Sequence, residues 1–360
     1  MPFSFRLGRN EVHLPGVALT LGLAAAGGFA AQALGLPLPF MLGSLLAVAG
    51  AALAGLRLAG RPPHVPLQLR AIAIPVIGVS IGGAFRPEIF AEARHWWPSL
   101  VCLVIFIPVA HQIGYRALKA SGRVDAPTAY FGSAPGGLLE TIQMGEEMGA
   151  DIPMLTMLQF LRLILTVVLV PIGFAILTGH AVGSAGGATL GGGTLPLGLQ
   201  DVAILFAAGA IGCWAGMRIG MPAGLVTGPL VLSAAAHLAG LTQTVPPQWM
   251  IAATQTVIGT TLGMRFAGVR MQSLLLALRL ALVNFGVMMA MALVIGITFA
   301  PLVQEPATAV MLAFAPGGLA EMSLVAVSLQ ISVIYVTLHH VLRIVLAVLF
   351  AKLFARHLRG

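Results

Sequence analysis

Charged residues are scarce in this chain. Aspartate, glutamate, lysine and arginine make up 8% of its 360 residues, and hydrophobic residues make up 58%. A soluble globular domain carries about 25% charged residues, so this composition cannot cover the surface of a water-soluble particle of this size. The scarcity of charge therefore excludes a soluble enzyme and a soluble DNA-binding protein.

Cysteines and familiar catalytic motifs are scarce too. The two cysteines, Cys102 and Cys213, lie within apolar segments, which is typical of small packed side chains and not of a disulfide or a metal pair. The sequence has no metal-binding spacing of His and Cys, no glycine-rich phosphate loop and no familiar serine nucleophile motif. We therefore expect no enzyme activity, no catalytic residue, no metal and no cofactor.

Long apolar runs dominate what is present. Residues Met154–Leu177, Leu274–Ala300 and Val333–Phe354 exceed the roughly 20 residues that a bilayer-spanning helix needs. The formal net charge of +8 comes largely from basic residues in short loops beside such runs, as expected for anchoring at the cytoplasmic face of a membrane. The sequence predicts an integral membrane protein whose partner is the lipid bilayer and not nucleic acid.

The chain contains an internal repeat. Residues 134–140 (Ala-Pro-Gly-Gly-Leu-Leu-Glu) match residues 315–321 (Ala-Pro-Gly-Gly-Leu-Ala-Glu) at an offset of 316 − 135 = 181. Upstream, matched glycines such as Gly27 and Gly212 keep an offset of 212 − 27 = 185. We expect a first membrane repeat at 12–178, an extracytoplasmic linker rich in Gly, Ser and Thr at 179–196, and a second repeat at 197–355.

Each half contains six apolar segments. In the first half they are roughly 14–34, 38–56, 67–84, 97–115, 127–148 and 153–177, and their counterparts are roughly 199–218, 222–240, 249–264, 271–299, 307–329 and 332–354. We expect the fifth segment of each half to be re-entrant and broken at the Ala-Pro-Gly-Gly motif. The expected fold class is all-α integral membrane, with about ten transmembrane helices plus two re-entrant or broken helices.

The distribution of lysine and arginine predicts the topology. With five true spans per half, 14 of the 19 basic residues fall on the cytoplasmic side, two fall outside and three fall within spans. An odd number of spans turns the second half upside down, so the two repeats are expected to be inverted. We expect a multi-pass protein of a bacterial inner membrane with both termini in the cytoplasm.

The broken segments are the candidate substrate site. Proline cannot continue a helix from upstream, and paired glycines permit unusual dihedrals and close approach to a ligand. The helix that begins after each break presents free amides and a positive dipole end that can attract anions. A structural kink is the alternative explanation. The candidate residues here are Pro135, Gly136, Gly137, Pro316, Gly317 and Gly318.

Charged residues accompany both breaks. Glu140 and Glu321 follow them, and Arg162 and Arg343 lie about 15–18 Å into the last spans, near mid-membrane. Charges at this depth are expensive and rarely face lipid. They either pair as Glu140–Arg162 and Glu321–Arg343 to brace the loops, or line a route for the substrate or for protons, and both roles can hold together.

Polar residues share a helix face with each arginine. Gln159 precedes Arg162 by three residues, and His339 and His340 precede Arg343 by four and three. A histidine pair can relay protons, whereas the simpler expectation is that an imidazole hydrogen-bonds a carbonyl. Gln159, His339 and His340 complete the set of candidate site residues.

The duplicated motif resembles that of the bacterial AbrB-type membrane protein family, over about residues 12–355. The resemblance implies a duplicated membrane domain. Members of this family have been labelled regulators of gene expression or ammonia monooxygenases. The resemblance implies no catalytic residues, and the sequence does not resemble the soluble DNA-binding regulator that shares the family's name.

Three classes of function remain open. Inverted repeats with interrupted helices are typical of secondary transporters, so the first hypothesis is a transporter or exporter of a small, anionic solute that couples to protons or another ion. The alternative is a membrane-embedded regulator of gene expression, although the short loops offer a partner little surface. A membrane monooxygenase would need copper or iron ligands that the sequence lacks. A homo-oligomer is compatible with each class.

The inverted arrangement makes a prediction about the linker. A cysteine introduced by Ser184→Cys should react with an impermeant maleimide added outside intact cells, because an odd number of spans precedes it. Labelling from the cytoplasmic side alone would contradict the inverted arrangement.

Overall fold

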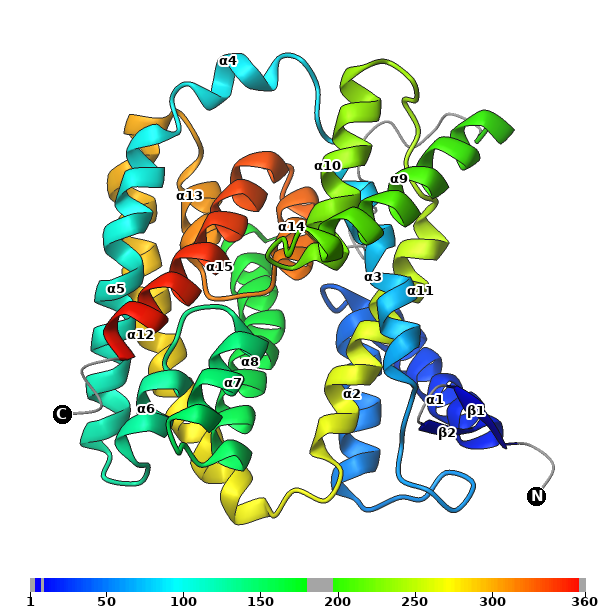
Figure 1. Ribbon diagram of the computed structural model, residues 1–360, viewed down its shortest axis with the longest axis vertical. Helices are drawn as coiled ribbons and strands as arrows, with labels where there is room; N and C mark the ends of the chain where they lie inside the picture. Colours follow the sequence, from blue (N-terminus) through cyan, green and yellow to red (C-terminus); the bar gives the residue numbers. More distant parts are fainter. Residues whose placement is uncertain (1–3, 8–9, 180–196, 356–360) are drawn as a thin grey trace. The chain divides into compact units, whose positions relative to one another are not determined.

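The computed structural model describes residues 4–7, 10–179 and 197–355, and these are predominantly helical (Figure 1). The expectation of an all-α protein is confirmed except near the amino terminus. There, β1 (Ser4–Leu7) and β2 (Asn10–His13) pair antiparallel, with Ser4 opposite His13. Residues 180–196 of the predicted linker, including Ser184, lie outside the described residues.

All twelve apolar segments predicted from the sequence contain helix. The helices of the first half are α1 (Leu14–Ala33), α2 (Pro39–Leu53), α3 (Leu67–Gly82), α4 (Ile89–Ala93), α5 (Trp97–Ala120), α6 (Ala126–Gly132), α7 (Leu138–Glu147) and α8 (Ile152–Thr178). Those of the second half are α9 (Leu199–Arg218), α10 (Gly224–Leu238), α11 (Gln248–Gly263), α12 (Met271–Val303), α13 (Ala307–Phe314), α14 (Leu319–Ser328) and α15 (Val333–Ala355), with the 3₁₀ turn η2 (Met264–Phe266) after α11. The short α4 and η2 are additions to the predicted segments.

Capping residues and glycines determine where several helices begin and end. Nδ1 of His13 accepts a hydrogen bond of 3.2 Å from the amide of Gly16 at the start of α1, and Asp125 accepts one of 2.6 Å from Thr128 at the start of α6. After α1 and α9 the chain turns at Gly35 and Gly220, whose φ angles of 67° and 72° favour glycine.

Among the described residues, six helices are long and apolar enough to cross a membrane. They are α1, α5, α9, α12, residues Ile152–Ile176 of α8 and residues Val333–Leu353 of α15. The other apolar helices of 10–17 residues are α2, α3 and α10. The described residues therefore contain several candidate spans, whereas the predicted number of ten is not established by helix length.

The chain divides into two compact units, and each combines helices from both predicted repeats. Unit 1 comprises Met1–Arg86 and Pro171–Val269, and unit 2 comprises Pro87–Val170 and Arg270–Gly360. The division at Pro171 falls within α8, which continues through this proline to Thr178. The compact units therefore do not follow the sequence repeats.

Glycine contacts bring the helices of unit 1 together. A Cβ atom at Gly43 of α2 would overlap the carbonyl oxygen of Gly27 of α1, and one at Gly228 of α10 would overlap that of Gly212 of α9. These two contacts are equivalent in the sequence repeat. Only the lack of a side chain permits such close approach of two helices.

A second set of contacts in unit 1 is reciprocal between the halves. Gly78 of α3 packs against the backbone of Val226 in α10, and Gly259 of α11 packs against the backbone of Met41 in α2. Because Gly78 corresponds to Gly259 and Met41 to Val226, each half packs onto the other through the same pair of positions.

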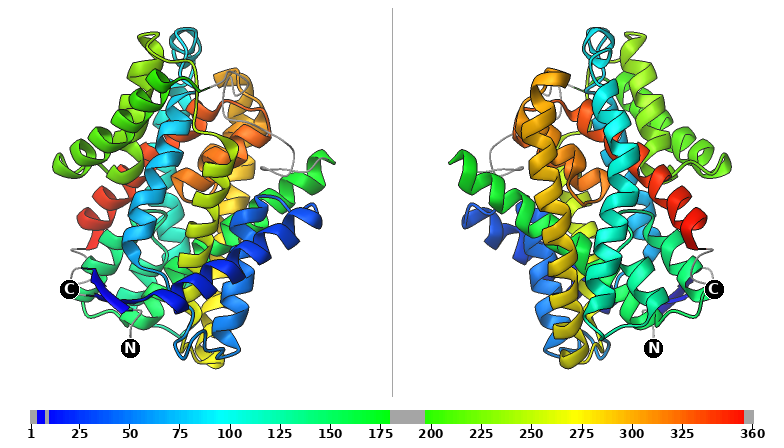
Figure 2. Two further views of the ribbon diagram at one scale, coloured as in Figure 1. Left: turned by 90° about the vertical axis from the view of Figure 1, so that its right-hand side faces the viewer. Right: turned by 90° about the vertical axis from the view of Figure 1, so that its left-hand side faces the viewer.

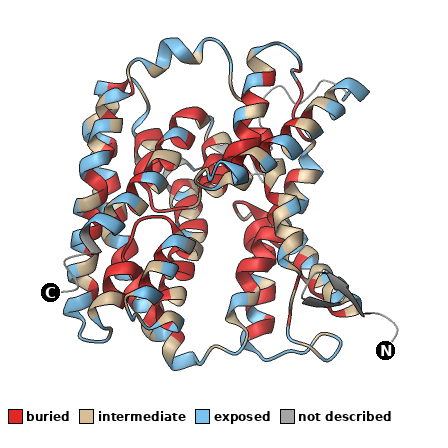
Figure 3. Ribbon diagram, viewed as in Figure 1, coloured by how far each residue is buried: buried red, intermediate tan, exposed pale blue. Residues whose placement is uncertain are grey.

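Unit 2 contains both broken helices. The long helices α5 and α12 run side by side (Figure 2), and both α13 and α5 contact α15. α13 and much of α14 are buried (Figure 3), whereas α7 exposes Glu140, Glu146 and Glu147 along one face. The two broken segments thus have the same plan but different surroundings.

The glycine contacts predict a position-specific effect on stability. Gly43→Ala should lower the stability of the purified protein by about 1–3 kcal/mol, because the new methyl group must displace the backbone of α1. Gly50→Ala in the same helix meets no atom within 4 Å, so it should be neutral or stabilising by up to about 1 kcal/mol. Thermal unfolding in detergent would compare them, and equal losses would contradict this account of helix packing.

Candidate functional site

Both Ala-Pro-Gly-Gly motifs lie where a helix is interrupted. α6 ends at Gly132 and α7 begins at Leu138, whereas α13 ends at Phe314 and α14 begins at Leu319. The structure therefore has two pairs of short helices at the predicted breaks. All thirteen candidate residues belong to unit 2.

The second glycine of the pair has a different role in each break. Gly137 has a φ of +66°, a conformation that glycine adopts without strain, whereas Gly318 has an ordinary extended conformation with φ −81° and ψ 150°. A Cβ atom at Gly318 would overlap the carboxylate of Glu321. The expectation of unusual dihedrals holds for Gly137, and at Gly318 the small residue leaves space for the acid.

Each break packs against the last helix of the other half. A Cβ atom at Gly136 would lie 3.2 Å from Cβ of Ala347 in α15, and one at Gly317 would lie 3.0 Å from Cγ2 of Thr166 in α8. Ala347 and Thr166 are equivalent in the repeat, since 347 − 166 = 181. This exchange repeats within unit 2 the reciprocity seen in unit 1.

The two arginines cap the carboxyl ends of the first short helices. The guanidinium of Arg162 donates to the carbonyl of Ala134, and that of Arg343 donates to the carbonyls of Ala315 and Gly317. A helix that ends in an apolar setting leaves carbonyls without partners and carries partial negative charge at that end. The arginines meet both needs.

Gln159 and His340 satisfy a second carbonyl at each break. Nε2 of Gln159 donates to the carbonyl of Phe131 at 2.6 Å, and Nε2 of His340 donates to that of Leu312 at 3.0 Å. The two pairs are equivalent in the repeat. The first half therefore uses an amide where the second half uses an imidazole, which fits the simpler of the two expectations for a histidine here.

The two acids lie in the first turn of the helices that follow the breaks. Glu140 is exposed in α7, and Glu321 is half-buried in α14 with its carboxylate folded back over Gly318. A carboxylate in the first turn is stabilised by the positive end of the helix. Because the hydrogen bonds of Arg162 and Arg343 go to backbone carbonyls, pairing of each arginine with an acid stays a prediction.

His339 is held by residues that the sequence did not reveal. Its Nδ1 donates to the carbonyl of Tyr335 at 2.8 Å, and its Nε2 lies 2.9 Å from the hydroxyl of Ser99. Its ring packs on that of Tyr335 with centroids 4.2 Å apart. The spacing of Tyr335 four residues before His339 could have suggested a contact, but no sequence signal indicates Ser99 on a distant helix.

The electrostatics of the site are unusual. Arg162 and Arg343 are 3% and 1% exposed, and their positive charges are close enough to repel each other. The Nε of each guanidinium has no hydrogen-bond partner among the described residues, and neither has Oε1 of Gln159. Two buried cations with unused donors form a place where a negative charge would be stabilised.

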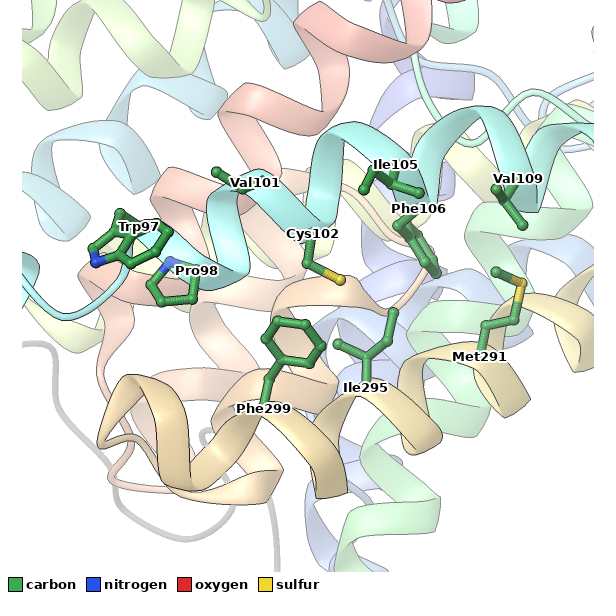
Figure 4. Close-up of a pocket in the computed structure, with 10 residues that line it drawn as sticks. All are labelled: Trp97, Pro98, Val101, Cys102, Ile105, Phe106, Val109, Met291, Ile295 and Phe299. Atoms are coloured by element: carbon green, nitrogen blue, oxygen red, sulfur yellow. The ribbon is translucent and has the colours of Figure 1, made fainter.

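A separate groove lies between α5 and α12 and contains none of the candidate residues (Figure 4). It has a volume of about 400 Å³. Its lining is almost entirely apolar, and it consists of Trp97, Pro98, Val101, Cys102, Ile105, Phe106, Val109, Met291, Ile295 and Phe299. Phe106 packs on Phe314, which in turn packs on His339, so a wall of the groove adjoins the second break.

The apolar helices and the paired breaks define a helical membrane protein with two interrupted helices that are stabilised by buried polar side chains. The chain belongs to the AbrB family, whose description is "Transition state regulatory protein AbrB" and which matches residues 50–359. The family predicted from the duplicated motif is confirmed.

Two relatives match much of the chain. A Bacillus subtilis (strain 168) protein described as "Uncharacterized protein YhjN" is 26% identical over 370 aligned positions, which cover 94% of this chain and 93% of the relative. An Escherichia coli (strain K12) protein described as "Putative regulator AbrB" is 22% identical over 252 positions, which cover 70% of this chain and 69% of the relative.

The equivalence of Gln159 and His340 predicts which substitutions the site tolerates. His340→Leu should cost about 1–3 kcal/mol of stability, because the carbonyl of Leu312 loses a buried donor. His340→Gln should retain most of the stability, because glutamine makes the equivalent bond in the first half. Thermal unfolding of both variants in detergent would decide, and equal losses would show that the imidazole has a role beyond capping.

Proposed function

We propose that this protein is a secondary transporter of small anionic solutes, with its binding site beside the two broken helices of unit 2. The paired, buried arginines carry the proposal. Each guanidinium uses donors to cap a helix and keeps Nε without a partner among the described residues. Capping alone does not require two cations close enough to repel each other.

An anion would resolve this repulsion. A buried charge is costly unless it is paired and hydrogen-bonded, and two like charges at the same depth add to the cost. A carboxylate or phosphate that accepts hydrogen bonds from both Nε groups would supply the missing negative charge. The amino ends of α7 and α14 start nearby in the chain, but their own acids already complement them, so the arginines are the main recognition groups.

The reciprocal packing supports the inverted repeat. Contacts of the form Gly136 to Ala347 and Gly317 to Thr166 exchange equivalent positions between the halves, as a two-fold relation would require. With the distribution of basic residues, this favours an axis in the membrane plane. The proposal places the protein in a bacterial inner membrane with both termini in the cytoplasm. It is compatible with assembly into a homo-oligomer.

Regulation of gene expression is the second candidate function, and one relative's description favours it. A transporter that exports or imports a signalling solute would change gene expression indirectly, so the two functions are compatible. A direct regulator would need a surface that a partner recognises. The proposed transport involves no enzymatic step.

Uptake assays test the proposal. Vesicles containing the purified protein would be screened with labelled carboxylates, phosphates, amines and sugars, and accumulation of an anion is expected. Arg343→Gln should reduce uptake of that anion by about 10- to 100-fold, because a charge-assisted hydrogen bond contributes about 1.5–3 kcal/mol. Arg343→Lys keeps the charge and should retain part of the uptake.

The control for this substitution is another arginine within a span. Arg279 of α12 is exposed, so Arg279→Gln should leave uptake near the wild-type rate. Melting temperatures of all variants would separate loss of folding from loss of transport. Anion uptake that survives Arg343→Gln in a folded protein would reject the role of the paired arginines.

A further inference from the structure

Glu305 lies in the turn between α12 and α13, just outside the spanning part of α12. Its carboxylate accepts a hydrogen bond of 3.1 Å from the indole Nε1–H of Trp96. Trp96 is 2% exposed and Glu305 is half-buried. An acidic side chain is thus partly withdrawn from water where the chain turns towards the second break.

The hydrogen bond connects two helix starts. Trp96 immediately precedes α5, and Glu305 is followed by Pro306 at the start of α13. Gln304, the residue before Glu305, has a φ of +58°, which is uncommon for a residue other than glycine. The bond therefore holds a tight turn before α13 against the start of α5.

A row of packed aromatic rings connects this turn to the candidate site. The ring of Trp96 packs edge-on against Tyr335 at 5.3 Å, and Tyr335 packs on His339. The hydroxyl of Tyr335 interacts with the side chains of Ser99 and Glu305. The rings of Trp96 and Tyr335 therefore connect the turn at Glu305 with the ring of His339.

We propose that Glu305 is the proton-binding site of this protein and that its protonation fastens the turn before α13 against α5. The proposal rests on the proposed transport function, to which it adds the proton as the coupling ion. The histidines are less suited to this task, because His339 and His340 are fully buried and burial disfavours the positively charged imidazolium.

The electrostatics of the turn set the pH of the change. Burial and the negative charge of Glu92 raise the pKa of Glu305 to about 7, against a smaller opposing effect of the hydrogen bond from Trp96. The titratable groups that act here are Glu92 from α4, Tyr335 from α15 and, through Tyr335, Cys102 from α5. Glu305 is neutral below this pH; above it, the carboxylate is repelled by Glu92 and favours contact with water.

Trp96 offers a direct probe of this titration. The other tryptophans, Trp97, Trp214 and Trp249, are exposed, so each can be replaced by phenylalanine to leave Trp96 as the single emitter. In lipid nanodiscs without any solute, its emission should titrate with a midpoint of about pH 7. Glu305→Gln should abolish the titration, because the amide keeps an acceptor for the indole but cannot ionise.

Glu92→Gln is the matched control and should lower the midpoint, because it removes the negative charge that raises the pKa of Glu305. Emission that does not change between pH 5 and 9, or a titration that persists after Glu305→Gln, would overturn the proposal. The probe needs no solute, so absence of anion uptake alongside an intact titration would reject transport and retain Glu305 as a proton-binding site.

Discussion

The hydrogen bonds that α8 and α15 donate to the carbonyls of the broken helices are the interaction on which this structure depends. A helix can end within an apolar setting only if its last carbonyls find donors, because water is not there to supply them. Arg162 and Arg343 provide these donors, together with Gln159 and His340. Without these donors, the breaks at the Ala-Pro-Gly-Gly motifs would leave buried carbonyls unpaired and would destabilise the fold.

The same constraint explains why capping and binding can belong to one set of side chains. A cation at each helix end satisfies the carbonyls, but the two positive charges then repel each other. A guanidinium has five N–H donors, so it can hold a carbonyl and still present Nε to a ligand. The structural role of the arginines is therefore the origin of the proposed anion site and not an alternative to it.

Much of this arrangement follows from the sequence, because the repeat marks equivalent positions. The breaks, the acids and the polar residues before each arginine could be located from motif and spacing alone. The partners of the arginines could not, since opposite charges at matching positions suggest ion pairs as readily as carbonyl caps. The contacts of Ser99, Trp96 and Glu305 could not be predicted either, because each is a contact between distant segments of the chain. The division into two units, each taken from both repeats, was likewise not evident from the sequence.

The location of a bound anion would show whether Arg162 and Arg343 bind the solute together. An experimental structure of the protein in lipid, with a heavy oxyanion such as selenate in place of the solute, would show where negative charge binds. We expect the anion within hydrogen-bond distance of Nε in both Arg162 and Arg343, with the carbonyl caps intact. A structure in which both Nε groups bind protein or water alone, at saturating anion, would contradict it.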